Sequence, residues 1–406
     1  MNQHHRMGAK AVGLCLTLSV AIVACGDDDT VDPTTTSSSS SSAGGASSSS
    51  SSAGGMGGAG GSVSSCLPAT EHAGVFDITD PTLCVVAKYT TAEQALDLTW
   101  GRHGGPMLVR TVPDAGGTLS DAEVVRLSPP AGATGALTSA AETYDLDIDT
   151  TMQFLGAQAL DVPGTNGTLL SYTGFDTTGE VRVFDGTTPV TGIPMVGFFI
   201  GATLSTSEGT RLLHTGSTVL GDGVAANGDS GLYQAEFCTG LTLCATPAPS
   251  LVEAWAEFNG TVGFDGDGNA FASQFDATAG TTELRGFDAA SIAPGAATPA
   301  SGVTLATFTG SGTNIAALRP TSDDGGWVFL QPATLDAMFN PIPQDVEAHR
   351  FTDSGGVIAP DGGAAILTLS ADPKPQVNLL ADDQDRVWVG VPGTGETTFY
   401  VLARAD

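Results

Sequence analysis

The sequence predicts an all-β domain that is built from consecutive hairpins. Short runs with β-branched or aromatic residues recur through residues 66–406, and Gly, Asp, Asn, Thr or Pro bounds each run. A polar turn recurs directly before several of these runs. Helical patterns are scarce, because the one candidate, Thr91–Leu98, is short and could equally be a turn.

The chain begins with a segment that is typical of exported proteins. An uncharged stretch of 14 residues, Ala11–Ala24, follows a basic start made by His4, His5, Arg6 and Lys10. This stretch is shorter than the about 20 residues that a membrane-spanning helix needs. It ends in Ile22-Val23-Ala24-Cys25, which resembles the lipobox of bacterial lipoprotein precursors. The resemblance implies a signal peptide with its lipobox over residues 1–25 and acyl chains on Cys25. We therefore expect a lipid-anchored protein of the outer membrane, facing the periplasm or the cell exterior.

Residues 26–65 form the next segment, and they are almost free of apolar side chains. Two copies of a run of six serines followed by Ala-Gly-Gly lie at Ser37–Gly45 and Ser47–Gly55. Chains of this composition are flexible, and 40 residues have an average reach of roughly 35 Å. We expect a disordered tether, although glycosylated serines or a wall-binding repeat would have the same composition.

The charge of the chain excludes several kinds of partner. Asp and Glu number 44 and Lys and Arg 14, which gives a net charge of −30. Residues 66–406 hold 40 of these acidic and 12 of these basic side chains, so the folded region carries the excess. Such a charge repels phosphate backbones and anionic lipid surfaces. The sequence therefore predicts no nucleic-acid partner and leaves a protein, a glycan or a cation as the ligand.

The strands expected in the folded region follow one another at short intervals. Their predicted ranges are Met107–Val112, Thr168–Tyr172, Val181–Phe184, Val196–Ile200, Arg211–His214, Ala270–Phe275, Trp327–Leu330, Ala365–Leu369, Val377–Leu380, Arg386–Val391 and Thr398–Leu402.

A faint repeat organises these strands. Its core is a turn that usually has Asp in the first place and Gly in the fourth, and the fourth residues are Gly179, Gly231, Gly268, Gly326 and Asp385, which lie 52, 37, 58 and 59 positions apart. The Asp carboxylate accepts hydrogen bonds from nearby backbone N–H groups, and Gly supplies a positive φ. A spacing near 50 is what a four-stranded blade requires, which predicts a β-propeller of about six or seven blades. Two β-sandwich domains would contain the same hairpins and remain the alternative.

One stretch resembles the units of loosely repeating bacterial propellers, which read D-x-x-G-N-x-Y-V and then a strand that ends in R-F-D. Asp265–Ala289 is similar to this pattern, and Glu180–Asp185 repeats its end. The resemblance implies a propeller over residues 66–406.

Six cysteines occur in the chain, and four of them lie in the folded region. Because export exposes the protein to an oxidising compartment, we expect these four to form disulfides. Proximity along the chain favours Cys66 with Cys84 and Cys238 with Cys244, among three possible pairings.

Few patterns in the folded region point to chemistry. Asp265, Asp267 and Asn269, with Asp276 further along, partly match a calcium-binding loop, so we expect calcium as a candidate ion there. The tetrapeptide Gly228–Gly231 matches the nucleophile motif of serine proteases but lacks their flanking residues and falls at a repeat turn.

These observations favour a binding or scaffolding protein of the cell envelope over an enzyme. No residue is assigned as catalytic. A metal-assisted propeller hydrolase or lyase is the first alternative, and it requires carboxylates or histidines that meet in one pocket. A purely structural envelope component is the second.

Overall fold

The computed structural model describes residues 65–406 except for positions 94–97, 102, 114–118, 146–153, 163, 175–179, 195–198, 207–208, 217–230, 240, 244–249, 255–258, 277–278, 293–300, 311, 320–324, 338–339, 356 and 406. The chain divides into two units, Met1–Ser64 and Ser65–Asp406, and the second unit holds all of the described residues. Within them, no helix has the length and apolar character to cross a membrane.

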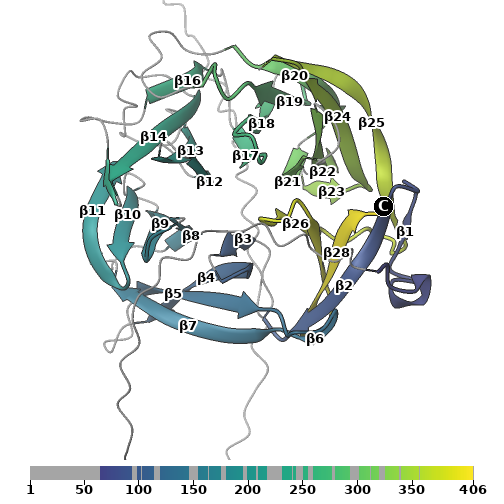
Figure 1. Cartoon of the computed structure of the whole chain (residues 1–406), viewed down its shortest axis with the longest axis horizontal. Coiled ribbons are helices and arrows are strands. Elements are labelled where there is room, and N and C mark those ends of the chain that lie inside the picture. Colours follow the sequence, from purple (N-terminus) through teal and green to yellow (C-terminus); the bar gives the residue numbers. More distant parts are fainter. Residues whose placement is uncertain are drawn as a thin grey trace, which may run out of the picture. The chain divides into compact units, whose positions relative to one another are not determined.

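Six β-sheets are arranged as a ring in the described part of the second unit (Figure 1). Each sheet is one blade, and we number the blades in chain order. Blade I contains β3 (Leu98–Gly101), β4 (Gly105–Pro113), β5 (Leu119–Ser128) and β7 (Thr138–Asp145). Blade II contains β8 (Phe154–Asp161), β9 (Gly167–Gly174), β10 (Glu180–Asp185) and β11 (Thr188–Pro194). Blade III contains β12 (Phe199–Thr206), β13 (Gly209–Gly216), β14 (Gly231–Thr239), β15 (Thr242–Leu243) and β16 (Ser250–Ala254).

The other three blades complete the ring. Blade IV contains β17 (Asn259–Phe264), β18 (Ala270–Asp276), β19 (Thr281–Phe287) and β20 (Val303–Thr309). Blade V contains β21 (Gly312–Leu318), β22 (Gly325–Leu335), β24 (Val346–Asp353) and β25 (Ile358–Leu369), together with β23 (Pro341–Pro343) and β1 (Phe76–Ile78). Blade VI contains β26 (Asn378–Ala381), β27 (Val387–Pro392), β28 (Thr397–Arg404), β2 (Leu83–Thr91) and β6 (Thr134–Ala136).

The first strand of each blade lies nearest the centre of the ring (Figure 1). β3 contacts β8, β8 contacts β12, β12 contacts β17, β17 contacts β21, β21 contacts β26, and β26 contacts β3 again. This closed order is that of a β-propeller, so the predicted fold is confirmed with six blades among the described residues, the lower of the two numbers expected. The alternative of two β-sandwiches is wrong, because two facing sheets would not give six sheets in a ring.

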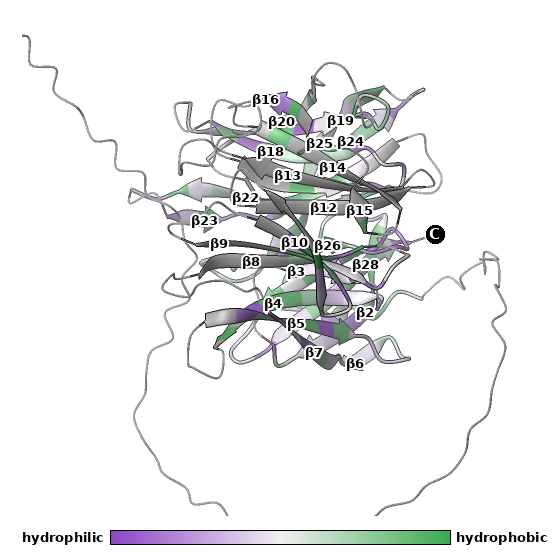
Figure 2. Ribbon diagram, turned by 90° about the vertical axis from the view of Figure 1, so that its left-hand side faces the viewer, coloured by the Kyte–Doolittle hydropathy of each residue, from purple (hydrophilic) through white to green (hydrophobic). Residues whose placement is uncertain are grey.

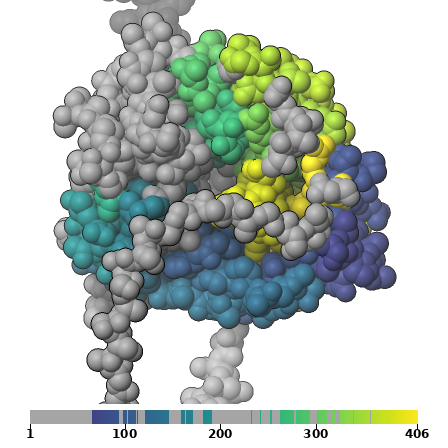
Figure 3. All heavy atoms as spheres, viewed as in Figure 1, coloured from purple at the N-terminus to yellow at the C-terminus, as the bar shows by residue number. Residues whose placement is uncertain are grey.

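The N-terminal end of the unit closes the ring. β2 comes early in the chain but pairs with β28, from Leu83 opposite Arg404 to Thr91 opposite Thr397. β1 pairs in the same way with the end of β25 in blade V. In Figure 3 the earliest described residues, in purple, lie against the C-terminal strands, in yellow. Blade VI is therefore built from both ends of the described chain.

Apolar side chains fill the spaces between neighbouring blades. Strand β19 alternates between more and less buried residues, as expected for a strand with one face against the next blade. In β22 the residues from Gly325 to Ala333 are all buried, since both faces of this strand are covered. The largest fully buried side chain is that of Trp388, in the cluster between blades VI and I. Figure 2 shows from the side that hydrophobic residues lie within strands such as β4 and β26.

The repeat found in the sequence runs in two phases. Gly268 and Asp385 lie in turns between the first and second strands of blades IV and VI, and Gly326 is the second residue of β22, the second strand of blade V. Gly179 and Gly231, in contrast, precede or begin β10 and β14, which are third strands. Each of these five positions therefore lies shortly before a strand or at its start, but the strand is not the same one in every blade. The mixed phases explain the irregular spacing.

The segment Thr91–Leu98 contributes the end of β2 and the start of β3. Residues 94–97 between them lie outside the described residues.

Candidate functional site

Charged side chains gather on the turns that follow three neighbouring inner strands. These strands are β17, β21 and β26 of blades IV, V and VI, which contact one another in the ring. We call the group the three-turn cluster, and it consists of Asp265, Asp267, Arg319, Asp382 and Asp385. Four carboxylates and one guanidinium group therefore meet at one end of the inner strands.

Asp265 organises the first turn. Its Oδ1 accepts hydrogen bonds from the backbone N–H groups of Asp267, at 3.0 Å, and Asn269, at 2.9 Å. Its Oδ2 accepts from the Asn269 side-chain Nδ2 at 2.9 Å. Gly268 has a φ of 84°, the left-handed conformation that glycine adopts without strain. The predicted division of labour between Asp and Gly is confirmed in this turn.

Asp382 organises the third turn with the same geometry. Its Oδ1 accepts from the backbone N–H groups of Gln384 and Arg386, both at 2.9 Å. Its Oδ2 accepts from Nε of Arg386 at 2.7 Å and from Nε1 of Trp388 at 3.0 Å. Asp385 takes the place of the glycine and has a φ of 55°. Asp is one of the few side chains that tolerate this conformation.

Arg319, directly after β21, joins the two turns. Its guanidinium group forms an ion pair with Asp267 of blade IV. A Cβ atom added at Gly266 would lie 3.5 Å from Oδ1 of Asp385, so the turns of blades IV and VI approach each other closely. Burial and the charge of Asp382 raise the pKa of Asp385, whereas the charge of Arg319 acts in the opposite direction. One cation thus offsets carboxylates from two blades.

Within the three-turn cluster, Asp265 is the carboxylate whose pKa is raised most clearly. Its side chain is buried, with a residue exposure of 3%. Burial raises its pKa to about 6, although the hydrogen bonds from Asn269 and the charge of Arg319 act to lower it. The charge of Asp353 raises it further. Nδ2 of Asn269 also donates to Oδ2 of Asp353, at 3.2 Å. This one amide group therefore binds the carboxylates of Asp265 in blade IV and of Asp353 in blade V.

The second strong polar group lies between blades I and II. Arg126 of β5 is 2% exposed, and its Nη2 donates to Oδ1 of Asp161 in β8 at 2.8 Å and to Oγ1 of Thr168 in β9 at 2.9 Å. The same nitrogen lies 3.2 Å from the hydroxyl of Tyr144, whose pKa burial raises. Its Nη1 forms an ion pair with Glu142. Arg126 therefore links the third and fourth strands of one blade to the first two of the next.

A similar link joins blades III and IV. Nε and Nη2 of Arg285 in β19 donate to the two carboxylate oxygens of Glu253 in β16, at 2.8 and 2.7 Å. This two-point contact is the strongest geometry that an arginine and a carboxylate can form.

The residues predicted to hold calcium are engaged with N–H donors in this structure. Asp265 accepts the hydrogen bonds of its own turn, Asp267 pairs with Arg319, and Oδ1 of Asn269 accepts from the backbone N–H of Ala289 at 3.0 Å. Strand β18 carries Asp276 about 20 Å away from the turn. Among the described residues, no group of three or more His, Cys, Asp or Glu side chains has a metal-binding arrangement. Calcium at this turn stays a prediction.

Of the predicted disulfides, one lies within the described residues. Cys66 and Cys84 are bonded, with their Cα atoms 5.6 Å apart, which confirms this pair. Cys238 lies in β14, but Cys244 lies outside the described residues, as does the lipid-attachment residue Cys25.

Sequence reasoning missed Arg126, Asp161, Tyr144 and Thr168 as one group. The available signal was Arg126 itself, a charged residue between Val125 and Leu127 in an otherwise apolar part of β5. Arg319 gave no such signal.

Comparisons with known proteins identify similar folds only. No family model matches the chain, and no curated protein matches it. Among solved structures, a gluconolactonase from Xanthomonas campestris is 12% identical with a TM-score of 0.40, and the match covers 81% of this chain and 95% of that one. The six-bladed fucose-binding lectin from Aleuria aurantia is 13% identical with a TM-score of 0.40, covering 76% and 88%. The propeller of Dos1 is 11% identical with a TM-score of 0.39, covering 75% and 67%.

Proposed function

We propose that this chain is a lipid-anchored protein of the cell envelope whose propeller serves as a rigid binding or scaffolding module. The observation that best supports a rigid module is the set of largely buried polar side chains that join neighbouring blades. Arg126, Arg285 and Asn269 each bond to acidic groups of a neighbouring blade. Such contacts fix the blades relative to one another, and a rigid ring holds its connecting loops in place for a partner.

The charge of the chain supports the class of ligand. With a net charge of −30, the module favours cationic or neutral groups on a protein or glycan and disfavours phosphate backbones. The motif Ile22–Cys25 supports the anchor, because two or three acyl chains on one cysteine hold a protein on a membrane durably.

Replacing the acylated cysteine tests the anchor. We expect Cys25→Ser to abolish incorporation of labelled fatty acid and to move the protein from the membrane fraction to the soluble fraction. Cys15→Ser is the matched control, since Cys15 lies in the same segment upstream of the lipobox. A wild-type protein that keeps its initial Met and a free thiol at position 25 would rule out the anchor.

Arrays of glycans and of basic peptides test the module. We expect the mature chain to be retained on members of at least one of these classes and not on duplex DNA. No retention on any array would favour a purely structural component instead.

A further inference from the structure

The first described residues form a strap across the outside of blades V and VI. We call residues Cys66–Thr82 the N-terminal strap, and it contains the short helix η1 (Ala69–Glu71) and strand β1. The strap ends where β2 begins, at Leu83.

Noncovalent contacts hold the middle of the strap on blades V and VI. β1 pairs with β25 over three residues, from Phe76 opposite Leu369 to Ile78 opposite Leu367. The Phe76 side chain is fully buried, and its ring meets that of Tyr400, in β28 of blade VI, edge to face at 4.9 Å. Burying one Phe contributes about 2 kcal/mol, so these contacts are favourable but short in extent.

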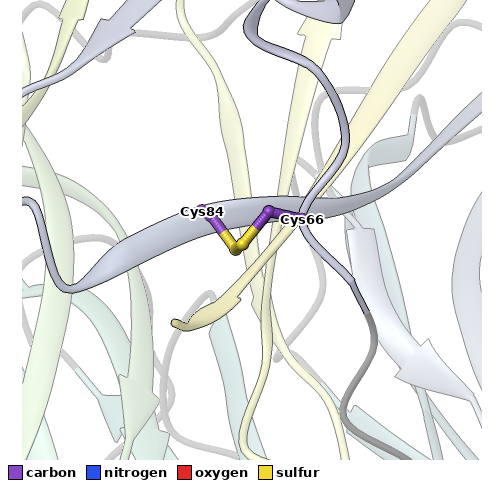
Figure 4. Close-up of a disulfide and its surroundings, with 2 residues drawn as sticks. All are labelled: Cys66 and Cys84. Atoms are coloured by element: carbon purple, nitrogen blue, oxygen red, sulfur yellow. A yellow bond between two sulfur atoms is a disulfide. The ribbon is translucent and has the colours of Figure 1, made fainter. Parts of the chain in front are cut away.

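Covalent and polar contacts hold the start of the strap on blade VI. The Cys66–Cys84 disulfide joins its first residue to β2, as Figure 4 shows. The backbone N–H of Leu67 donates to the carbonyl oxygen of Val85 at 2.7 Å. Nζ of Lys88 donates to the carbonyl oxygen of Glu71 at 2.9 Å.

The β1–β25 and β2–β28 ladders differ in their resistance to a pull from the N-terminal side of the chain. The hydrogen-bonded ladder between β2 and β28 spans eight residue pairs, whereas that of β1 spans three. Tension that arrives at Cys66 can reach β2 by two routes. One passes through the disulfide to Cys84, and the other passes through the whole backbone of the strap. Because the disulfide joins Cα atoms 5.6 Å apart and the strap route is 18 residues long, the disulfide becomes taut first.

We propose that the Cys66–Cys84 disulfide acts as a mechanical bypass, which transfers tension from the preceding chain directly to the ring-closing strand β2 and keeps the N-terminal strap unloaded. Without the disulfide, the same tension peels η1 and β1 from the blades in sequence and uncovers Phe76. The device therefore keeps the outer edge of blade V covered while the propeller is pulled.

This inference gains its biological setting from the proposed anchor, since a protein held by a lipid at position 25 is pulled through this point. The pulling experiment needs no lipid, so a failure of the proposed disulfide role can be distinguished from a failure of the proposed lipid anchor.

Single-molecule pulling tests the bypass. Handles are attached enzymatically to the two ends of the mature chain, and wild type is compared with Cys66→Ser/Cys84→Ser. We expect the double variant to show an early extension of about 60 Å, which is the length of 18 released residues, before the rest of the domain unfolds. Wild type should lack this step.

The matched control is Cys238→Ser/Cys244→Ser, which removes the other cysteine pair of the folded region and should resemble wild type in its early trace. The length released after the early step must equal that of residues 84–406, which shows that the variant is folded. An early step in wild type would overturn the proposal. So would a variant in which strap and domain unfold in a single event.

Discussion

At the scale of single residues, aspartates close several turns of the propeller by accepting hydrogen bonds within the turn. Asp265 and Asp382 each accept two backbone N–H groups and bind the side chain four residues later. Asp336 binds Asn340 in a similar way, because it accepts from the Asn340 backbone N–H at 2.8 Å and from its side-chain Nδ2 at 3.0 Å. The local part of this pattern was predictable, because spacing within a turn is visible in the sequence. The bond from Asn269 to Asp353 was not, since these residues are 84 positions apart.

The raised pKa of Asp265 predicts how stability depends on pH. This pKa is about 6 in the folded chain against an ordinary value of 3.8, so the folded state retains the proton to higher pH than the unfolded state. The free energy of unfolding should therefore fall as pH rises from about 4 to about 6 and then level off. Removing the group with Asp265→Asn should reduce this slope by up to about 1.4 kcal/mol per pH unit.

Urea unfolding at a series of pH values across this window measures the slope. Asp383→Asn is the control, because Asp383 is exposed beside the similar turn of blade VI. Equal slopes for wild type and Asp265→Asn would contradict the prediction.

At the scale of elements, strands were predictable where burial shapes their composition. The run Trp327–Leu330 lies in β22 and is buried throughout, and Ala270–Phe275 lies in β18 and is buried over its first four residues. Strand β7 gave no signal, because it is an outer strand whose residues are mostly exposed and polar or small. An exposed edge needs no apolar side chains, so its sequence resembles that of a loop.

The link from Arg126 predicts a large effect of one substitution on two blades. Arg126→Met should lower the free energy of unfolding by about 3–5 kcal/mol, because it leaves the buried carboxylate of Asp161 without its arginine. Arg110→Met is the control, since the Arg110 side chain is 49% exposed and its ion pairs should contribute less than about 1 kcal/mol.

Adding Asp161→Leu to Arg126→Met should recover part of the loss, because no charge then remains buried there. Chemical denaturation of the three variants measures these differences. A loss for Arg126→Met no larger than that for Arg110→Met would show that the buried group does not hold the blades together.

At the scale of the whole molecule, the repeat spacing was enough to predict blades, but the way the ring closes was not predictable. No strand was expected over Leu83–Thr91, although this segment forms β2 and completes blade VI. Closure depends on pairing between the two ends of the described chain, and the spacing of the repeat turns carries no sign of that pairing.

The charge of the whole molecule predicts how dissolved ions act on it. Because residues 66–406 hold 40 acidic and 12 basic side chains, repulsion within this folded region should outweigh the attraction of its exposed ion pairs. We expect the melting temperature to rise by a few degrees as NaCl increases from about 20 to about 500 mM, over which the screening length falls severalfold. A fall in melting temperature would mean that local ion pairs dominate.

Millimolar calcium at constant ionic strength separates calcium binding from charge screening. A further rise in melting temperature that EDTA reverses would support an ion at Asp265, Asp267 and Asn269. If adding EDTA to the calcium-treated protein leaves its melting temperature unchanged, calcium binding is ruled out. Charge screening by NaCl does not depend on chelation, so EDTA distinguishes the two effects.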